Sequence, residues 1–124
     1  NGVVVFCGDI NIAVDTHFDK TKVSPSPGIY PFELDFYTQL KNINYHDIIS
    51  KDDNIIYTWW DTRQRKENGM SASRNRNMGW RLDYFFIKEN SDMEAIVLKT
   101  IGENNDGIPL ASDHAPVLMY NSKA

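Results

Sequence analysis

The feature that most constrains the fold is a run of four apolar residues close to the N-terminus, Val3-Val4-Val5-Phe6. Because neighbouring side chains of a strand point to opposite faces, a strand of this composition is covered on both faces. Covered strands belong to layered domains, in which helices or a second sheet pack on the first. Cys7 continues the run, and we expect a buried, unreactive thiol there. The run therefore predicts a layered α/β domain.

Proline placement and apolar periodicity predict the remaining elements. A helix is expected over residues 31–41, because Pro31 suits a first helical turn and because Phe32, Phe36 and Leu40 fall on one face. β-Branched and aromatic content predicts further strands, and polar content with proline or glycine predicts loops. The predicted strands are 55–60, 82–87, 94–101 and 116–120, and the predicted loops are 15–30, 63–78 and a turn at 103–107.

The composition fits one small globular domain. The chain has 124 residues, of which 41% are apolar and 24% charged, and its formal net charge is -4. These proportions are typical of folded proteins, and the length suits one domain. No run approaches the roughly 18 apolar residues that cross a bilayer, so no membrane association is expected. The single cysteine allows no internal disulfide and is compatible with a reducing, intracellular compartment.

Positive charge is concentrated in one segment of this acidic chain. Between Thr62 and Arg81, six cationic side chains accompany one carboxylate, Glu67. Such a segment can hold a phosphate backbone along one edge of a protein, although a solvated loop has the same composition. Trp59, Trp60 and Trp80 flank the segment, where a tryptophan is suited either to stacking on a base or sugar or to core packing.

Two motifs place polar groups where predicted strands begin or end. Gly8-Asp9-Ile10-Asn11 follows the first strand, and Ser112-Asp113-His114 precedes the last. A carboxylate at a strand end can orient or deprotonate water, and an amide can hold a phosphate oxygen. The oxygen ligands of Asp9, Asn11 and Asp113 favour Mg²⁺ or Mn²⁺ over zinc. Gly-Asp-x-Asn also forms ordinary turns, so the prediction of a metal and phosphate site depends on both motifs.

Asp83 lies within a predicted strand, on the same face as Phe85 and Ile87. A carboxylate on an apolar face costs free energy unless it is paired. The nearest candidate partner is His114, which immediately precedes another strand. A hydrogen bond between them would fix the imidazole tautomer and raise its pKa, which suits a phosphate-binding or acid group. The alternative is that Asp83 caps a neighbouring backbone amide.

Four segments together resemble the C-terminal half of the exonuclease III family of apurinic/apyrimidinic endonucleases. This family is part of the endonuclease/exonuclease/phosphatase superfamily, which includes DNase I. The segments are Gly8-Asp9-Ile10-Asn11, Tyr57-Thr58-Trp59-Trp60-Asp61, Asn77-Met78-Gly79-Trp80-Arg81-Leu82-Asp83-Tyr84-Phe85 and Ser112-Asp113-His114-Ala115-Pro116-Val117. The Gly-Trp-Arg-Leu-Asp-Tyr stretch is the most specific to the exonuclease III branch.

The resemblance implies a fold and an activity. Residues 1–124 would form the C-terminal portion of one DNase I-like domain, a four-layer α/β sandwich, contributing mainly one mixed or antiparallel sheet with one or two helices. The implied activity is that of a DNA repair nuclease of base excision repair that uses Mg²⁺ or Mn²⁺. It would cut double-stranded DNA 5′ to abasic sites and act as a 3′-to-5′ exonuclease and 3′-phosphodiesterase.

The resemblance also implies roles for individual residues. Asp9 would align the attacking water, Asn11 would bind the scissile phosphate, and His114, held by Asp83, would neutralise charge in the transition state. Asp113 would bind the metal together with Asp9 and Asn11. A pocket for the extruded abasic sugar would be lined by Trp59, Trp80 and Leu82, and the DNA backbone would be held by Arg63, Arg74 and Arg76.

The family's first half, which supplies its main metal-binding glutamate, has no counterpart among these residues. A complementary N-terminal chain is therefore an expected partner, and residues 1–124 alone are expected to be inactive. The segment after Pro31 also departs from the family, because Leu34 stands where an arginine is usual. Two alternatives remain open: another phosphoesterase of the superfamily, such as a retrotransposon-type endonuclease, and a non-catalytic DNA-binding fragment.

Overall fold

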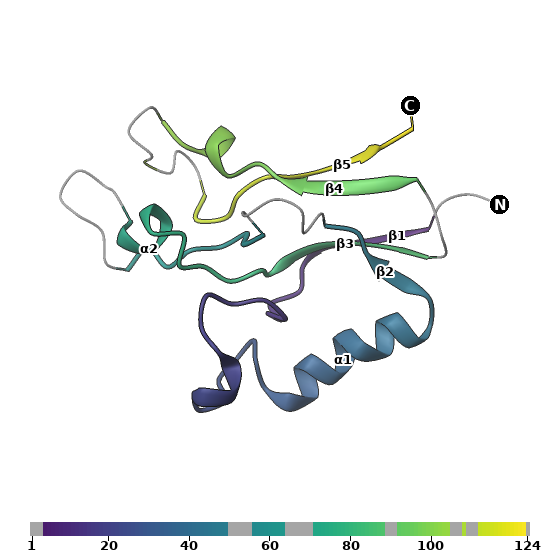
Figure 1. The fold of residues 1–124 in the computed structure, drawn as a ribbon, viewed down its shortest axis with the longest axis horizontal. Coiled ribbons are helices and arrows are strands. Elements are labelled where there is room, and N and C mark those ends of the chain that lie inside the picture. Colours follow the sequence, from purple (N-terminus) through teal and green to yellow (C-terminus); the bar gives the residue numbers. More distant parts are fainter. Residues whose placement is uncertain are drawn as a thin grey trace.

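The computed structural model describes residues 4–49, 56–63, 71–88, 92–104, 108 and 112–123. Two antiparallel sheets and one long helix dominate these ranges (Figure 1). The first sheet has the strand order β1-β3-β2, and the second pairs β4 with β5. The strands are β1 (Val5–Asp9), β2 (Tyr45–Asp47), β3 (Asp83–Lys88), β4 (Met93–Val97) and β5 (Val117–Asn121). The helices are α1 (Pro31–Asn42), the short α2 (Ala72–Asn75) and the 3-10 turns η1 (Lys20–Lys22) and η2 (Lys99–Gly102).

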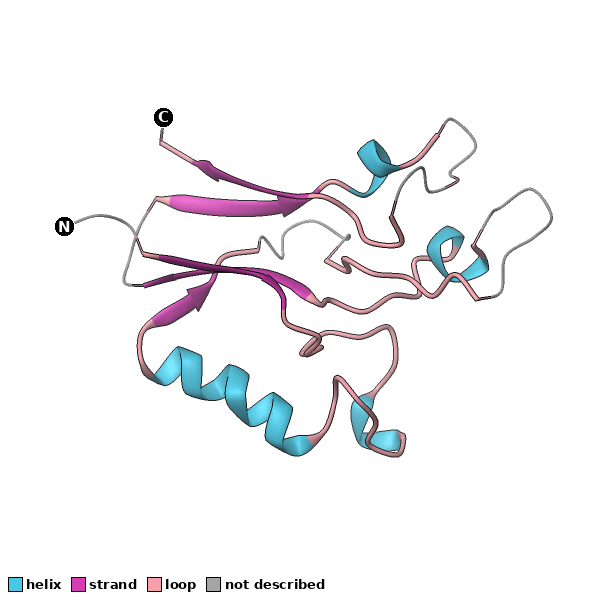
Figure 2. Cartoon of the chain, turned by 180° about the vertical axis from the view of Figure 1, so that it is seen from behind, coloured by secondary structure: helices cyan, strands magenta, loops and turns pink. Residues whose placement is uncertain are grey.

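The three-stranded sheet lies between α1 and the two-stranded sheet (Figures 1 and 2). Alternation along β3 explains how one strand contacts both layers. Tyr84 and Phe86 point toward α1, where their rings lie 6.0 and 5.8 Å from that of Tyr37. Phe85, on the other face, packs with Val117 against a core that also holds the buried side chains of Ile49, Trp60, Ala95, Val97 and Ala115. The predicted α/β class is confirmed, although the described residues form two sheets and not mainly one.

Helix α1 confirms the helix predicted at 31–41, but part of its predicted buried face is wrong. Phe32 and Phe36 are 72% and 43% exposed. Tyr37 is the aromatic side chain of α1 that contacts the sheet, and its hydroxyl donates to Asp47 Oδ2 at 2.7 Å. The helix is therefore rotated so that Tyr37 faces the sheet and its hydroxyl reaches Asp47. This rotation leaves Phe32 and Phe36 exposed to solvent.

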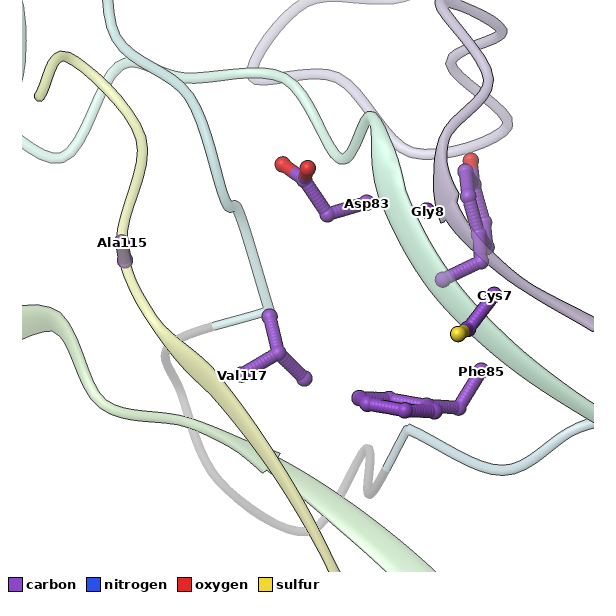
Figure 3. Close-up of a pocket in the computed structure, with 7 residues that line it drawn as sticks. Cys7, Gly8, Asp83, Phe85, Ala115 and Val117 are labelled. Atoms are coloured by element: carbon purple, nitrogen blue, oxygen red, sulfur yellow. The ribbon is translucent and has the colours of Figure 1, made fainter.

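Strand β1 is also less covered than its composition predicts. Val5 and Phe6 are 36% and 40% exposed, and Cys7 is exposed, so the prediction of a buried thiol is wrong. The reason is position, because β1 is an edge strand that pairs with β3 on one side only within the described ranges. Figure 3 shows Phe85 and Val117 pointing toward each other across a hollow whose wall includes Cys7.

Several predicted boundaries change in the structure. Of the strand predicted at 55–60, the described residues 56–60 contain only an isolated bridge at Trp59, because this residue pairs singly with Trp80 and with His114. The strand predicted at 94–101 ends at Val97, and η2 follows it. Strand β2 was not predicted, and the loops predicted at 15–30 and 63–78 contain η1 and α2. Most of the predicted turn at 103–107 lies outside the described residues. In the described part of the chain, no helix is both long enough and apolar enough to span a membrane.

Candidate active site

The register of the first sheet brings two carboxylates together. Asp9 is the last residue of β1 and Asp83 is the first of β3, and the two are paired in the antiparallel ladder. Both carboxylates therefore lie at the same end of the sheet. His114 precedes β5 and is held beside this end by its bridge to Trp59. Residues that are distant in sequence thus form one cluster at the margin of the sheet.

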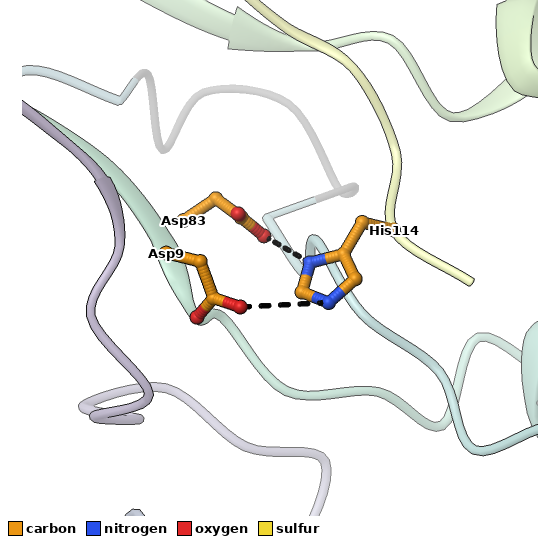
Figure 4. Close-up of side chains that lie close together, drawn as sticks. All are labelled: Asp9, Asp83 and His114. Atoms are coloured by element: carbon orange, nitrogen blue, oxygen red, sulfur yellow. Dashed lines mark hydrogen bonds and ion pairs between the residues drawn. The ribbon is translucent and has the colours of Figure 1, made fainter. Parts of the chain in front are cut away.

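The imidazole of His114 lies between carboxylates (Figure 4). Its Nδ1 is 2.6 Å from Asp83 Oδ2, which confirms the predicted hydrogen bond. Its Nε2 is 3.7 Å from Asp9 Oδ2 and 3.9 Å from Asp113 Oδ1. The hydrogen bond from Asp83 raises the pKa of His114 above its ordinary value of 6.5, against the opposing effect of partial burial. The hydrogen bond therefore orients the ring, so that Nδ1 faces Asp83 and Nε2 faces the carboxylates of Asp9 and Asp113.

Thr58 positions this cluster, and its role was not predicted. Its side chain is fully buried, and Oγ1 accepts hydrogen bonds from the backbone nitrogens of Leu82 and Asp83 at 2.9 and 3.0 Å. A buried hydroxyl needs such partners, because leaving it unpaired costs free energy. The only signal in the sequence is a polar residue within an apolar stretch, and this does not identify the partner.

Asn11 is placed by a turn that immediately follows β1. Its backbone is left-handed, with φ of 54°, a conformation that asparagine tolerates better than most residues. Asp9 Oδ1 accepts from the Asn11 backbone nitrogen at 3.0 Å, and Ile10 continues the ladder by donating to the Leu82 carbonyl at 3.1 Å. The turn leaves the Asn11 side chain exposed at the pocket described next.

An open pocket adjoins His114, and sequence-predicted residues line much of it. These are Asn11, Trp59, Arg63, Trp80, Leu82 and His114. The indole rings of Trp59 and Trp80 meet edge to face at 6.0 Å, and Trp59 Nε1 donates to Asp113 Oδ2 at 2.9 Å. Behind the pocket, Leu82 packs with Ala13, Ile29 and Phe18 in a second apolar core. The pocket therefore has aromatic walls on a rigid base, as the resemblance implies.

Another part of the pocket wall comes from the loop before α1 and was missed by sequence reasoning. It contains Ser26, Pro27, Gly28 and, in the first turn of α1, Glu33. Gly28 has φ of +96°, and a Cβ there would lie 3.1 Å from Trp80 Cζ3 and 3.2 Å from the Asn11 carbonyl oxygen. Only glycine combines this backbone conformation with so close an approach. The proline and glycine content of the loop predicted a turn, but it gave no indication that the loop lines the pocket.

The three arginines predicted to hold DNA have different environments. Arg74 is 1% exposed, stacks over Trp60 and donates from Nε to Glu103 Oε1 at 2.5 Å. The prediction that it contacts a DNA backbone is therefore wrong, because its charge is buried and paired. Arg63 is exposed at the pocket rim, where it forms a two-nitrogen contact with Asp61, and Arg76 is exposed.

The fully buried Arg81 anchors a second charged group that we call the Arg81 network: Arg81, Asp15, Asp47, Tyr37 and Tyr84. The guanidinium donates to Asp15 Oδ2 at 2.7 Å and to Asp47 Oδ2. The Tyr84 hydroxyl lies 2.7 Å from the carbonyl oxygens of Ile12 and Arg81. Burial opposes the charge of Arg81, but Asp47, Tyr84 and Asp15 outweigh it, so the pKa of Arg81 is raised. The network joins α1, β2 and β3 to the loop behind Asn11.

The charge and donor atoms of the cluster suit a divalent cation. Three carboxylates surround the imidazole of His114, so the cluster has an excess of negative charge whether or not the ring is protonated. Asp9, Asp83 and His114 have ligand atoms within 4.8 Å of one another. Asp83 is occupied by His114, however, so the freer oxygens are those of Asp9, Asn11 and Asp113. Mg²⁺ commonly uses one or two protein carboxylates and completes its shell with water and phosphate oxygens.

Known proteins match nearly the whole chain, although no protein-family model does. DNA repair nuclease APEX1 of Danio rerio is 28% identical over 123 residues, and an exodeoxyribonuclease of Bacillus subtilis (strain 168) is 31% identical over 120 residues. These matches cover 94% and 92% of this chain but 36% and 42% of the two relatives. The resemblance found in the sequence is thus confirmed, and the chain spans less than half of either relative.

Two solved structures share the fold. A 3′-5′ exonuclease (NExo) from Neisseria meningitidis aligns with a TM-score of 0.72 and 25% identity over 97% of this chain and 45% of its own. The AP endonuclease LMAP from Leishmania major aligns with a TM-score of 0.61 and 25% identity over 93% of this chain and 34% of its own. The architecture described above is therefore that of a segment of a nuclease fold.

Proposed function

We propose that residues 1–124 form the C-terminal portion of a single nuclease domain that hydrolyses phosphodiester bonds in DNA with a divalent cation. The observation that carries the proposal is the position of His114. Its Nδ1 is held by Asp83, its Nε2 faces Asp9 and Asp113, and the residue lines a pocket that also includes Trp59 and Trp80. Relatives named as repair nucleases and exonucleases support the same reading.

The proposal assigns each residue of the cluster a role that is compatible with its geometry. His114, with its pKa raised by Asp83, donates from Nε2 to a non-bridging phosphate oxygen and offsets the charge that develops during displacement. Asp9 accepts a proton from water, or orients it, on the open side of the imidazole. The exposed amide of Asn11 binds a further phosphate oxygen. These groups are fixed by strand ends and by Thr58, so little reorganisation accompanies the reaction.

Mg²⁺ or Mn²⁺ would be held by oxygens of Asp9, Asn11 and Asp113. When bound, the cation supplies Lewis-acid stabilisation of the phosphate and balances the negative charge of the cluster. Completion of its shell would require residues from a complementary N-terminal chain, which is a proposed partner besides DNA. We also propose an intracellular location, in line with DNA repair.

The substrate is proposed to be double-stranded DNA with an abasic site or a 3′ end. The pocket between Trp59, Trp80 and Leu82 would accept the extruded sugar, and a nucleotide without a base costs the least free energy to extrude. Arg63 and Arg76, the exposed arginines among the described residues of the basic segment, would contact the backbone. Cleavage would occur 5′ to the abasic site, with 3′-to-5′ exonuclease and 3′-phosphodiesterase action at ends.

A fusion protein tests this function. The chain replaces the matching part of the Bacillus subtilis exodeoxyribonuclease, and the fusion is incubated with an abasic duplex and Mg²⁺. We expect incision 5′ to the lesion, and negligible incision by residues 1–124 alone. A folded fusion that binds the duplex without cutting it would support a non-catalytic DNA-binding role. Rapid incision by the isolated chain would show that its dependence on N-terminal residues is wrong.

A further inference from the structure

A pair of stacked aromatic rings lies at the start of α1, outside the residues that line the pocket. The rings of Tyr30 and Phe32 are nearly parallel, with centroids 5.5 Å apart and an interplanar angle of 13°. Phe32 is 72% exposed, the largest exposed fraction among the exposed large apolar side chains of the described residues. A stacked pair of this kind presents a flat aromatic surface to solvent, and that surface does not contribute to the core.

The stack is tied to the wall of the pocket by the backbone. Glu33 Oε1 accepts hydrogen bonds from the backbone nitrogens of Gly28 and Tyr30, at 2.9 and 3.2 Å. Gly28 and Glu33 both line the pocket, and Gly28 touches the ring of Trp80. One carboxylate thus holds the pocket wall and the aromatic stack in a fixed relation. A ligand that fills the pocket and continues past Gly28 would meet the stack next.

The charges nearby favour a base over a phosphate at this position. The first residues of α1 include Glu33 and the exposed Asp35, and the first turn carries no lysine or arginine. Carboxylates repel a phosphate backbone, whereas the face of a nucleobase is uncharged and stacks on aromatic side chains. The exposed ring of Phe32 therefore suits the base and not the backbone of a nucleic acid strand.

We propose that Tyr30 and Phe32 form a base-stacking subsite for an unpaired nucleobase beside the nucleotide in the pocket. The inference rests on the proposed function, because it takes the occupant of the pocket to be DNA. Because the base loses its aromatic stacking partner, removal of Phe32 weakens binding of a strand with an unpaired base by about tenfold. Fully paired DNA, whose bases are already stacked, gains little from the subsite.

Fluorescence of 2-aminopurine, which is quenched by stacking, tests the subsite with the whole 124-residue chain. The probe is an abasic duplex with a mismatched 2-aminopurine next to the lesion, and binding is followed independently by anisotropy. We expect quenching on binding, loss of quenching and about tenfold weaker binding in Phe32→Ala, and retention of both in Phe32→Trp. The matched control is Phe36→Ala, one turn along α1, where the side chain is also exposed. Circular dichroism verifies that each variant is folded.

The outcomes separate this inference from the proposed function. DNA binding with unchanged quenching in Phe32→Ala overturns the subsite and leaves the nuclease proposal intact. Equal losses in Phe32→Ala and Phe36→Ala overturn it as well, because they show that the effect is not specific to the Tyr30–Phe32 stack. If the wild-type chain binds the abasic duplex in neither the isolated form nor the fusion protein, the subsite is overturned, whereas incision by the fusion protein still decides the nuclease proposal.

Discussion

Two charged groups lie within three residues of each other at the start of β3, and they differ in balance and in burial. In the Arg81 network, the cation is fully buried and Asp15 and Asp47 neutralise it. In the cluster around His114, three carboxylates accompany one imidazole, and the side chains of His114 and Asp83 are 26% and 21% exposed. The first group has its partners within the chain, whereas the second has unused charge and access to solvent.

The difference indicates what each group does. Buried charges that are paired within the fold fix one packing of the elements around them, and removal of one partner leaves the others unpaired at high cost. Unbalanced negative charges at an open margin contribute little to stability and have affinity for an external cation, which can in turn hold a phosphate. We therefore expect mutations in the Arg81 network to lower stability, and mutations in the cluster around His114 to lower the rate of catalysis with little change in stability.

The largest expected effect is on stability, in Arg81→Met. Removing the guanidinium leaves Asp15 and Asp47 without their cation, which costs roughly 3–5 kcal/mol of unfolding free energy. Arg63→Met is the matched control, because the side chain of Arg63 is 88% exposed, and it should change stability by less than about 0.5 kcal/mol. Urea unfolding measures both. Equal losses of unfolding free energy in the two variants would contradict the different roles assigned to the buried and the exposed arginine.

The reverse pattern is expected for His114→Ala in the active fusion protein. Its rate of incision should fall about 10²–10³-fold, which corresponds to roughly 3–4 kcal/mol of transition-state stabilisation, while DNA binding and stability change little. Single-turnover kinetics, binding anisotropy and urea unfolding separate the three quantities. A variant that cuts at the wild-type rate would remove His114 from the chemistry.

Trp80→Ala tests whether a residue beside the Arg81 network acts in the pocket or only in the core. Trp80 lines the pocket and immediately precedes Arg81 in the chain. We expect incision at abasic sites to fall about 10–100-fold, and more than digestion of undamaged 3′ ends, since only the extruded sugar needs the full pocket. The measurement is the ratio of the two activities in wild type and variant. An unchanged ratio with lower stability would place Trp80 in the core alone.

The smallest expected effect concerns pH. Asp83 is the main cause of the raised pKa of His114, so the pair stabilises the folded state most when the imidazole is protonated. The stability that wild type gains over Asp83→Asn should be fully present below about pH 6.5 and decline as pH rises through the raised pKa. Thermal unfolding of both proteins at about pH 5.5 and about pH 9 measures it. A gain that grows with pH would contradict the assignment.

The sequence predicted contacts where one residue type had few possible partners. Asp83 on an apolar strand required a cation, and His114 was the evident candidate, so their hydrogen bond was predictable. Arg74 and Arg81 could not be distinguished from surface arginines. Their neutralising carboxylates lie far along the chain, with Glu103 29 residues from Arg74 and Asp15 66 residues from Arg81. The pattern of charges along the sequence shows a local excess of arginine and lysine. It does not show the tertiary contacts that bury individual arginines.

Local sequence patterns predicted where helix α1 lies in the chain, but they did not predict which of its faces packs on the sheet. Pro31 and the apolar spacing of the following residues were sufficient to place α1, but its rotation depends on Asp47, which Tyr37 reaches through its hydroxyl. Gly28 and Thr58 act through contacts with Trp80 and with the start of β3, and no local pattern encodes those contacts. Both depend on how distant segments pack.

The most direct test of the central claim, that the cluster around His114 is an open phosphate site, is an NMR titration of the His114 ring. The titration is carried out on the 124-residue chain with and without saturating abasic duplex. We expect a pKa above the ordinary 6.5 in the free protein, and a further rise when a phosphate binds beside Nε2. A pKa at or below 6.5 that does not respond to DNA would contradict the claim.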